Sequence, residues 1–289
     1  ATATSLPELG TGISSITLVG EPDLAAGDAF GSNLFNLLII GLLDLGWRDG
    51  PILNKVGKDV AVVGLLGATL ISISGGGILL HQVTSSMDGL YTSPISIILL
   101  LSLFIAIFII YRGQRNSSST TSTETSSTST INLKKSTSIY LVSAGIIIGT
   151  SIWLSIIGQQ LSEELGWEAS FIGTQFLALS TSLPELAASV AAIQLNAPEL
   201  AISNVLGSNL FNMGFVLFVD DLVYTDGAIL SGLSRIHALS AALAVAMTLV
   251  VTTAILLKNR RRPVRFLTVE SVMIFGVYAA SSVLAFNLN

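Results

Sequence analysis

Apolar segments of roughly 20 residues recur along the chain, and they constrain its fold more than any other feature. About 20 apolar residues in a helix are enough to cross the hydrocarbon core of a bilayer. Only 11% of the residues are charged, whereas soluble domains carry about 25%. The sequence therefore predicts an all-α polytopic membrane protein. Nine spans are expected, at residues 1–20, 24–45, 59–80, 90–111, 139–161, 169–195, 199–219, 236–257 and 266–288.

The charged residues predict the orientation of these spans. Because successive spans cross the membrane in opposite directions, every second loop lies on the same side of the membrane. Twelve of the thirteen Lys and Arg residues fall in the loops of one side, and only Arg235 lies on the other. Acidic residues dominate the opposite loops. The positive-inside rule makes the basic side cytoplasmic, so we expect a multi-pass protein of the plasma (inner) membrane. The acidic loop residues are Glu21, Asp23, Asp88, Glu163, Glu164, Glu168, Asp220, Asp221 and Asp226.

Residues 112–138, RGQRNSSSTTSTETSSTSTINLKKSTS, separate the fourth and fifth spans. A tract so rich in Ser and Thr cannot build a core, which predicts a flexible cytoplasmic linker. A regulatory calcium-binding loop would need clustered carboxylates, and only Glu124 is present. The linker divides the chain into two halves, residues 1–111 and 139–289.

The two halves share two motifs in the same order. TSLPEL occurs at 4–9 and 181–186, and GSNLFN occurs at 31–36 and 207–212. The chain is therefore an internal duplication. Five spans follow the linker and four precede it, so we expect one further helix, within about 40 residues, upstream of residue 1. Ten helices in two halves of five would form an inverted repeat, as in many secondary transporters.

TSLPEL places a carboxylate and two hydroxyls on one helical face. Glu8 shares a face with Thr4 and Ser5 because these residues are four and three positions apart, and the second copy repeats the spacing. Each proline leaves a backbone carbonyl without its helical partner, which a bound cation could replace. The alternative is a protonated or ion-paired glutamate, but no Lys or Arg lies inside an apolar segment. The matching residues of the second copy are Glu185, Thr181, Ser182 and Pro184.

GSNLFN provides a second polar surface. Ser32 and Asn36 are four residues apart and share a face, as do Ser208 and Asn212. Interhelical hydrogen bonding would explain these side chains without a ligand, and Gly31 and Gly207 would allow close helix packing. Asp28 stands one turn before Ser32, where the second half has Asn204. Asp28 is either a third carboxylate of the site or part of an aqueous vestibule.

The donor set indicates the kind of ligand. All these groups are hard oxygens, the chain has no cysteine, and both histidines lie far from the motifs. Hard oxygens suit Na⁺, Ca²⁺ and Mg²⁺, and two carboxylates balance one Ca²⁺, two Na⁺ or two protons. The net charge of −5 is spread over separate loops. We expect metal cations and the lipid bilayer as partners, with no nucleic acid, no obligate protein partner and no cofactor.

At these motifs the chain resembles the sodium/calcium exchanger superfamily, the cation/calcium antiporters. The resemblance implies a mid-membrane site formed by the first, second, sixth and seventh spans of this chain. Glu8 and Glu185 would bind both Ca²⁺ and Na⁺, and Thr4 and Thr181 would contribute to the Ca²⁺ position. Ser5, Ser182, Ser32 and Ser208 would line flanking Na⁺ positions, with Asn36 and Asn212 at the centre. Some sodium-coupled members have Asp where this chain has Asn212, which leaves the coupling ion open.

Several functions are compatible with these features. We expect an antiporter that exchanges Ca²⁺ for Na⁺ by alternating access, and the alternative is exchange of H⁺ for Ca²⁺ or another divalent cation. A channel with an acidic selectivity ring is less consistent with two fused inverted halves. An enzyme is not expected, because neither H-E-x-x-H nor G-x-S-x-G occurs in the sequence.

Overall fold

The structure is a computed structural model that describes residues 2–84, 91–118, 133–258 and 268–288, and these residues form helices and connecting loops without a β-strand. The first half comprises α1 (Leu6–Ser14), the π-helix η1 (Ser15–Val19), α2 (Pro22–Gly46), the 3₁₀ turn η2 (Ile52–Lys55), α3 (Lys58–Val83) and α4 (Pro94–Ser118). The second half comprises α5 (Leu133–Leu165), α6 (Ala169–Ile172), the π-helix η4 (Gly173–Leu177), α7 (Ala178–Thr181), α8 (Leu183–Gln194), α9 (Pro198–Phe211), the π-helix η5 (Asn212–Val216), α10 (Leu217–Val223), α11 (Ile229–Gly232), α12 (Ile236–Leu257) and α13 (Val269–Asn287).

The all-α polytopic fold predicted from the apolar segments is confirmed. Among the described residues, eight helical stretches are long and apolar enough to cross a membrane, beginning with Pro22–Gly46 and ending with Val269–Asn287. The first expected span is represented by α1 and η1, which together cover 6–19 and are shorter than the others. Residues 119–132 of the predicted linker lie outside the described residues, and α4 and α5 extend into its two ends.

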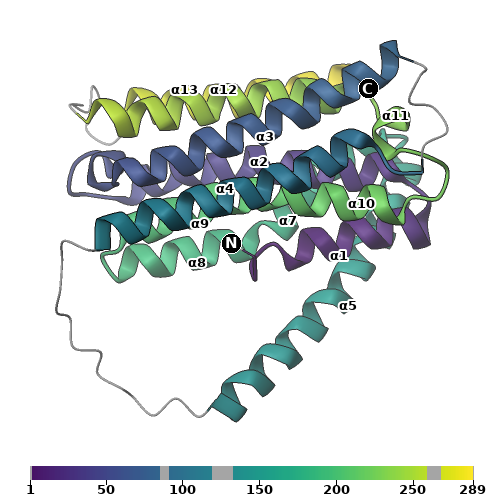
Figure 1. Ribbon diagram of the computed structural model, residues 1–289. Coiled ribbons are helices and arrows are strands. Elements are labelled where there is room, and N and C mark those ends of the chain that lie inside the picture. Colours follow the sequence, from purple (N-terminus) through teal and green to yellow (C-terminus); the bar gives the residue numbers. More distant parts are fainter. Residues whose placement is uncertain (1, 85–90, 119–132, 259–267, 289) are drawn as a thin grey trace.

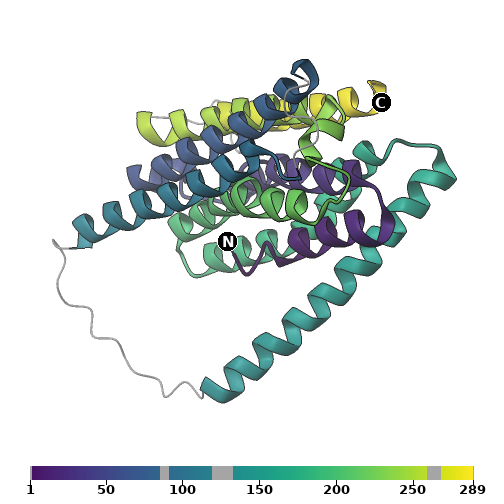
Figure 2. The same ribbon diagram turned by 45° about the vertical axis from the view of Figure 1, so that its right-hand side comes forward.

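The two halves fold into matching elements. By the offset of the repeated motifs, α1 of the first half corresponds to α8, and α2 corresponds to α9–α10. Helix α3 corresponds to α12, and these two pack against each other along most of their length. In Figure 1 the helices of the bundle run nearly parallel, with α5 diverging from it. Figure 2 shows the same divergence, and the side chains of residues 141–150 are mostly exposed.

Helix α2 lies at the centre of the bundle. Nineteen of its residues are buried, and it contacts elements of both halves, including α1, η4, α9, α12 and α13. The predicted close approach at Gly31 is confirmed, because a Cβ added there would lie 2.6 Å from the Thr174 Cα in η4. Gly27 faces Gly173 in the same way, with its added Cβ 2.9 Å from the Gly173 Cα. Small residues thus let the repeat helices meet at the backbone.

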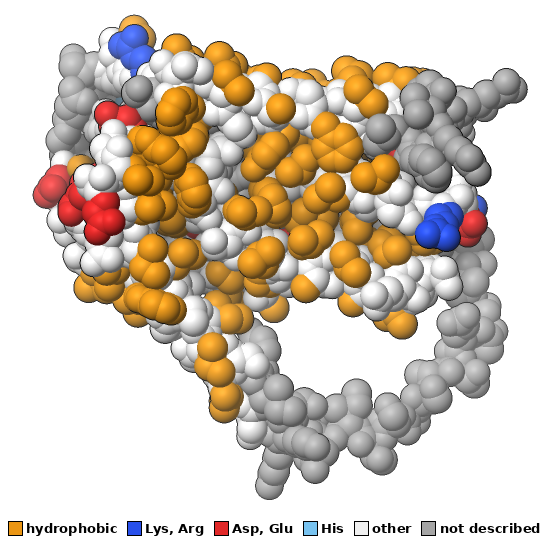
Figure 3. All heavy atoms as spheres, turned by 180° about the vertical axis from the view of Figure 1, so that it is seen from behind, with side chains coloured by type: hydrophobic (Ala, Val, Ile, Leu, Met, Phe, Trp, Pro, Cys, Tyr) orange, Lys and Arg blue, Asp and Glu red, His pale blue; other side chains and the backbone are white. Residues whose placement is uncertain are grey.

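The outer surface carries a broad apolar belt between two charged ends. Figure 3 shows hydrophobic side chains along the length of the helices, with acidic side chains gathered at one end and basic side chains mainly at the other. Exposed apolar residues such as Leu101, Phe104 and Phe108 line the outside of α4. In water such a surface would drive aggregation, whereas lipid tails solvate it. The protein is therefore an integral, multi-pass membrane protein.

Candidate functional site

At both copies of TSLPEL a helix begins directly after the serine, and in the second copy this serine also ends the preceding helix α7. Ser5 has φ −89° and ψ 14°, and its counterpart Ser182 has φ −85° and ψ 4°. A new helix begins at the next residue, with proline at its second position, where the missing N–H costs nothing. The glutamate follows in the first turn. The sequence therefore builds two half-helices whose N-terminal ends, which favour negative charge, hold Glu8 and Glu185.

The two copies of GSNLFN position the other predicted side chains. Ser32 lies ten residues after the start of α2 at Pro22, which places it about 15 Å along the helix axis and so near the middle of the membrane. In the second half, Ser208 lies in α9 and Asn212 begins η5. π-Helical turns are rare and occur often at functional sites. All four Ser and Asn side chains are completely buried.

The motifs of the two halves contact each other across the bundle. The Ser5 hydroxyl donates to Glu185 Oε1 at 3.3 Å, and the Ser208 hydroxyl donates to the same oxygen at 3.1 Å. The Thr4 and Ser208 hydroxyl oxygens are 3.5 Å apart. The second copy of TSLPEL thus receives a hydrogen bond from the first, so side chains of both halves meet at Glu185.

A second set of cross-repeat contacts surrounds Asp28. The Ser32 and Thr181 hydroxyl oxygens are 3.2 Å apart, and the Thr181 hydroxyl donates to Asp28 Oδ1 at 2.7 Å. The Thr11 hydroxyl, in α1, donates to Asp28 Oδ2. Asp28 is 1% exposed, so it is enclosed by the helices and does not line an open vestibule.

The Glu8 carboxylate is 1% exposed and lies close enough to Glu185 and Asp28 for their charges to interact. Within the described part of the chain, neither Glu8 oxygen has a hydrogen-bond partner. Such burial is costly, because an ionised carboxylate without partners loses most of its solvation. A bound cation would compensate both the charge and the missing contacts.

Several predicted ligands present oxygens that accept no hydrogen bond from the described residues. They are six in number: Glu8 Oε1 and Oε2, Glu185 Oε2, Ser182 Oγ, Asn36 Oδ1 and Asn212 Oδ1. Ca²⁺ binds 6–8 oxygens. No group of three or more His, Asp and Glu residues suited to a metal ion occurs in the described ranges. Hydroxyl, amide and backbone oxygens would have to complete the shell around the two glutamates, and the ligand roles stay a prediction.

Some buried polar residues of this region were not predicted from the sequence. Asn36 Nδ2 donates to Asn209 Oδ1 at 2.9 Å, and Asn209 Nδ2 donates to the Asn33 carbonyl at 3.2 Å. Asn33 and Asn209 are the third residues of the two GSNLFN copies, so the duplication itself contained the signal. Thr11, the partner of Asp28, has Ala188 at the matching position of the second half, and comparing the halves could not reveal it.

The prediction that Asp220 and Asp221 lie in an acidic loop is wrong. Helix α10 continues to Val223, and both carboxylates are completely buried. Asp221 accepts from the backbone N–H groups of Ser93 and Ile229, each at 2.7 Å, and so joins the end of α10 to the starts of α4 and α11. Asp88 lies outside the described residues.

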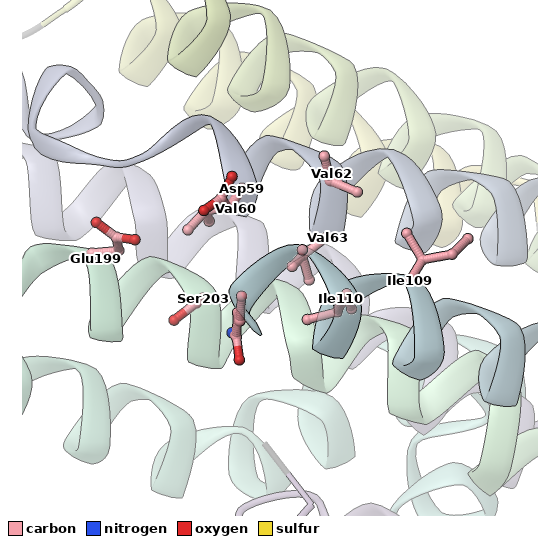
Figure 4. A pocket seen from close by; sticks show the side chains of 10 residues that line it. Asp59, Val60, Val62, Val63, Ile109, Ile110, Glu199 and Ser203 are labelled. Atoms are coloured by element: carbon pink, nitrogen blue, oxygen red, sulfur yellow. The ribbon is translucent and has the colours of Figure 1, made fainter. Parts of the chain in front are cut away.

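Among the cavities that the described residues form, two lie beside or beyond this polar centre. One, of about 210 Å³, opens at the basic end between α3, α4 and α9, where Figure 4 shows Asp59, Glu199 and Ser203 among valine and isoleucine side chains. The other is a largely apolar groove of about 570 Å³ beside α5 that reaches Pro7, Thr181 and Pro184. The groove therefore borders both copies of the TSLPEL motif.

Comparisons with known proteins agree with this architecture. The family model described as sodium/calcium exchanger protein matches residues 1–112 and 135–287, and the chain belongs to this family. The chain is 28% identical to the inner membrane protein YrbG of Escherichia coli (strain K12) over 76% of its own length and 66% of that protein. It is 26% identical to the putative antiporter CaxA of Alkalimonas amylolytica, over 71% of this chain and 62% of CaxA. The chain thus spans about two thirds of the length of these curated relatives.

Solved structures share the fold. The structure of native YfkE matches with a TM-score of 0.65 and 18% identity, over 98% of this chain and 81% of that one. The sodium-calcium exchanger NCX_Mj matches with a TM-score of 0.61 and 20% identity, over 96% and 82%. The H⁺/Ca²⁺ exchanger CAX matches with a TM-score of 0.58 and 12% identity, over 98% and 75%.

Proposed function

We propose that the protein is a secondary active antiporter that exchanges Ca²⁺ for Na⁺ across the membrane by alternating access. The observation that carries this proposal is the pair Glu8 and Glu185, two buried glutamates from a duplicated motif whose copies are joined by the hydrogen bond from Ser5 to Glu185. Family membership and the description of CaxA as a putative antiporter support it. With transport as its function, the protein would not be an enzyme.

The arrangement of the halves favours exchange over a permanent pore. Because both repeats contribute to one centre, tilting one half against the other would expose it to each side of the membrane in turn. Two negative charges are balanced by one Ca²⁺ or by two Na⁺. Occupation by one ion species therefore excludes the other, which is the condition for coupled counter-transport.

The ligand roles in this proposal are those that the resemblance to the family implies. Glu8 and Glu185 would hold both ions, and Thr4 and Thr181 would contribute to the Ca²⁺ position. Ser5, Ser182, Ser32 and Ser208 would line flanking Na⁺ positions, with Asn36 and Asn212 completing the centre. The basic ends of the helices and the linker 112–138 would face the cytoplasm, with the protein in the plasma (inner) membrane. The name of YrbG as an inner membrane protein supports this location.

A second candidate is exchange of H⁺ for Ca²⁺. The observation that favours it is the pair Asn36 and Asn212, two neutral and completely buried amides at the centre of the predicted site. With amides at both positions, Glu8 and Glu185 are the charged groups that a leaving Ca²⁺ would uncover, and two protons would neutralise them. The fold shared with the H⁺/Ca²⁺ exchanger CAX is compatible with this candidate.

Radiolabelled Ca²⁺ uptake into vesicles that contain the full-length protein tests the proposal. An outward Na⁺ gradient should drive uptake at constant pH, and an outward K⁺ gradient should not. Uptake driven by an outward proton gradient alone would favour the second candidate. No uptake with either gradient would refute antiport, and a Ca²⁺ current without a counter-ion would indicate a channel. Glu8→Gln and Glu185→Gln should each abolish uptake, whereas the exposed Asp226→Asn should leave it unchanged.

A further inference from the structure

Asp220 is a buried carboxylate, and its contacts reveal no structural role for it. It is 0% exposed, and neither of its oxygens has a hydrogen-bond partner among the described residues. Its carboxylate lies against the backbone of α1, because a Cβ added to Gly12 would come within 2.9 Å of both Asp220 Cγ and Oδ2. The absence of a side chain at Gly12 leaves the space that this carboxylate occupies.

Comparison of the two halves separates Asp220 from its neighbour Asp221. Asp44 accepts from the Ile52 backbone N–H at 2.9 Å, and Asp221 accepts from the Ile229 backbone N–H at 2.7 Å. In both contacts the donor lies eight residues after the aspartate, so Asp44 and Asp221 are equivalent residues of the two halves. Asp220 therefore corresponds to Leu43, a buried apolar residue.

A one-residue insertion explains this correspondence. The GSNLFN copies are offset by 176 positions, from 31 to 207, whereas Asp44 and Asp221 are offset by 177. The π-helix η5 lies between them and accommodates the extra residue, and α2 has no π-turn at the matching place. The insertion brings an aspartate to a position that is apolar in the other half. A requirement of the fold alone would be met by leucine there.

The surroundings of Asp220 are acidic and lead toward the central site. Asp28 lies close enough for its charge to interact with that of Asp220. The Thr11 hydroxyl, next to Gly12 in the chain, donates to Asp28, and Thr181 connects Asp28 to Ser32. Asp28 lies about 9 Å along α2 from its start at Pro22, which places it between the acidic end and the central site.

We propose that Asp220 and Asp28 form a second cation site, which takes Ca²⁺ on the acidic side of the Glu8–Glu185 centre. The two carboxylates carry the charge that one Ca²⁺ balances, and the Thr11 hydroxyl oxygen lies within the same cluster. An ion here would occupy a staging position between the acidic face and the centre. This inference rests on the proposed function, since it assigns the position a place on the transport path.

Equilibrium dialysis of the purified full-length protein against ⁴⁵Ca²⁺ tests the second site. The wild type should bind two Ca²⁺ per chain, and Asp220→Asn should bind one. In the vesicle assay, Ca²⁺ uptake by Asp220→Asn should be slower than uptake by the wild type. Gly12→Ala should weaken the same site about tenfold without changing any charge, because its methyl group displaces the carboxylate. Glu185→Gln should remove the other site. The control Asp226→Asn, an exposed carboxylate three residues after Val223, should bind as the wild type does.

The remaining outcomes overturn the inference. One Ca²⁺ per wild-type chain, or unchanged binding in Asp220→Asn, would show that the second site does not exist. Loss of the folded protein in both Asp220→Asn and Gly12→Ala, measured by thermal unfolding and gel filtration, would make Asp220 a structural residue. These outcomes leave the central site and antiport intact, whereas a wild type without gradient-driven uptake would refute the proposed function itself.

Discussion

Replacing Glu185 by Gln removes one charge from the candidate centre and leaves its shape. Glu185 Oε1 accepts from Ser5 at 3.3 Å and from Ser208 at 3.1 Å, and the amide oxygen of glutamine can accept both hydrogen bonds. The substitution therefore changes the charge and the Oε2 atom, which has no partner in the described structure. A purely structural role would survive it almost unchanged.

The size of the effect follows from the loss of one buried charge. Removing one member of a buried charge pair costs about 2–5 kcal/mol, and so lowers Ca²⁺ affinity by roughly 30-fold to several thousand-fold. At a Ca²⁺ concentration about 100 times the wild-type Kd, binding stabilises the wild type by about 2.7 kcal/mol. A variant with affinity about 100-fold weaker gains only about 0.4 kcal/mol at that concentration.

Thermal unfolding of the purified full-length protein, with Ca²⁺ and with a chelator, measures this difference. The Tm of the wild type should rise on adding Ca²⁺, whereas that of Glu185→Gln should rise less, by the amount that binding outside the central site supplies. In chelator the variant should be the more stable protein, because a neutral amide is easier to bury than a carboxylate. The exposed Glu164→Gln is the matched control. A full Ca²⁺ response in Glu185→Gln, or a Tm lowered equally in both conditions, would refute the assignment.

Three further predictions concern packing, a structural carboxylate and pH. Gly31→Ala should lower the unfolding free energy by about 1–3 kcal/mol, because its Cβ would lie 2.6 Å from the Thr174 Cα. Gly46→Ala, whose Cβ would point into open space, should not lower it. Equal Tm values for the two variants would contradict this prediction. Asp44→Asn should lower stability by about 1–3 kcal/mol in denaturant unfolding but leave uptake per folded molecule unchanged, since its carboxylate accepts three hydrogen bonds outside the site. Burial, followed by neighbouring acidic charges, raises the pKa of Glu21. The stabilising contribution of Glu21 is therefore present below about pH 4.3 and lost as the pH rises through the folded-state pKa. Over that range the unfolding free energy of Glu21→Gln should fall less than that of the wild type. Parallel curves of unfolding free energy against pH for the two proteins would contradict this.

Much of the fold and of the candidate site could be predicted from the sequence, because membrane segments and duplicated motifs are local signals. The apolar segments predict the helices within about seven residues at each end, and Pro7 and Pro184 mark the starts of α1 and α8. The duplication by itself also pairs Glu8 with Glu185, since an inverted repeat brings matched half-helices to one centre.

The positions that were missed depend on packing that no local pattern encodes. Asp220 and Asp221 are adjacent acidic residues near a helix end, a pattern typical of a solvated loop. Their burial depends on a π-helical turn whose one-residue shift becomes visible only when the contacts of Asp44 and Asp221 are compared. The hydrogen bond from Thr11 to Asp28 likewise joins two helices whose rotation is fixed by tertiary contacts.

The location of a bound divalent cation tests the central claim most directly. Diffraction from crystals of the full-length protein soaked in Sr²⁺, recorded for anomalous scattering, would show where the ion lies without reference to transport. We expect a peak between the Glu8 and Glu185 carboxylates that disappears in Glu185→Gln. An ion bound only at the basic end, between Asp59 and Glu199, or a peak between the residue 8 and residue 185 side chains that persists in the variant, would contradict the account.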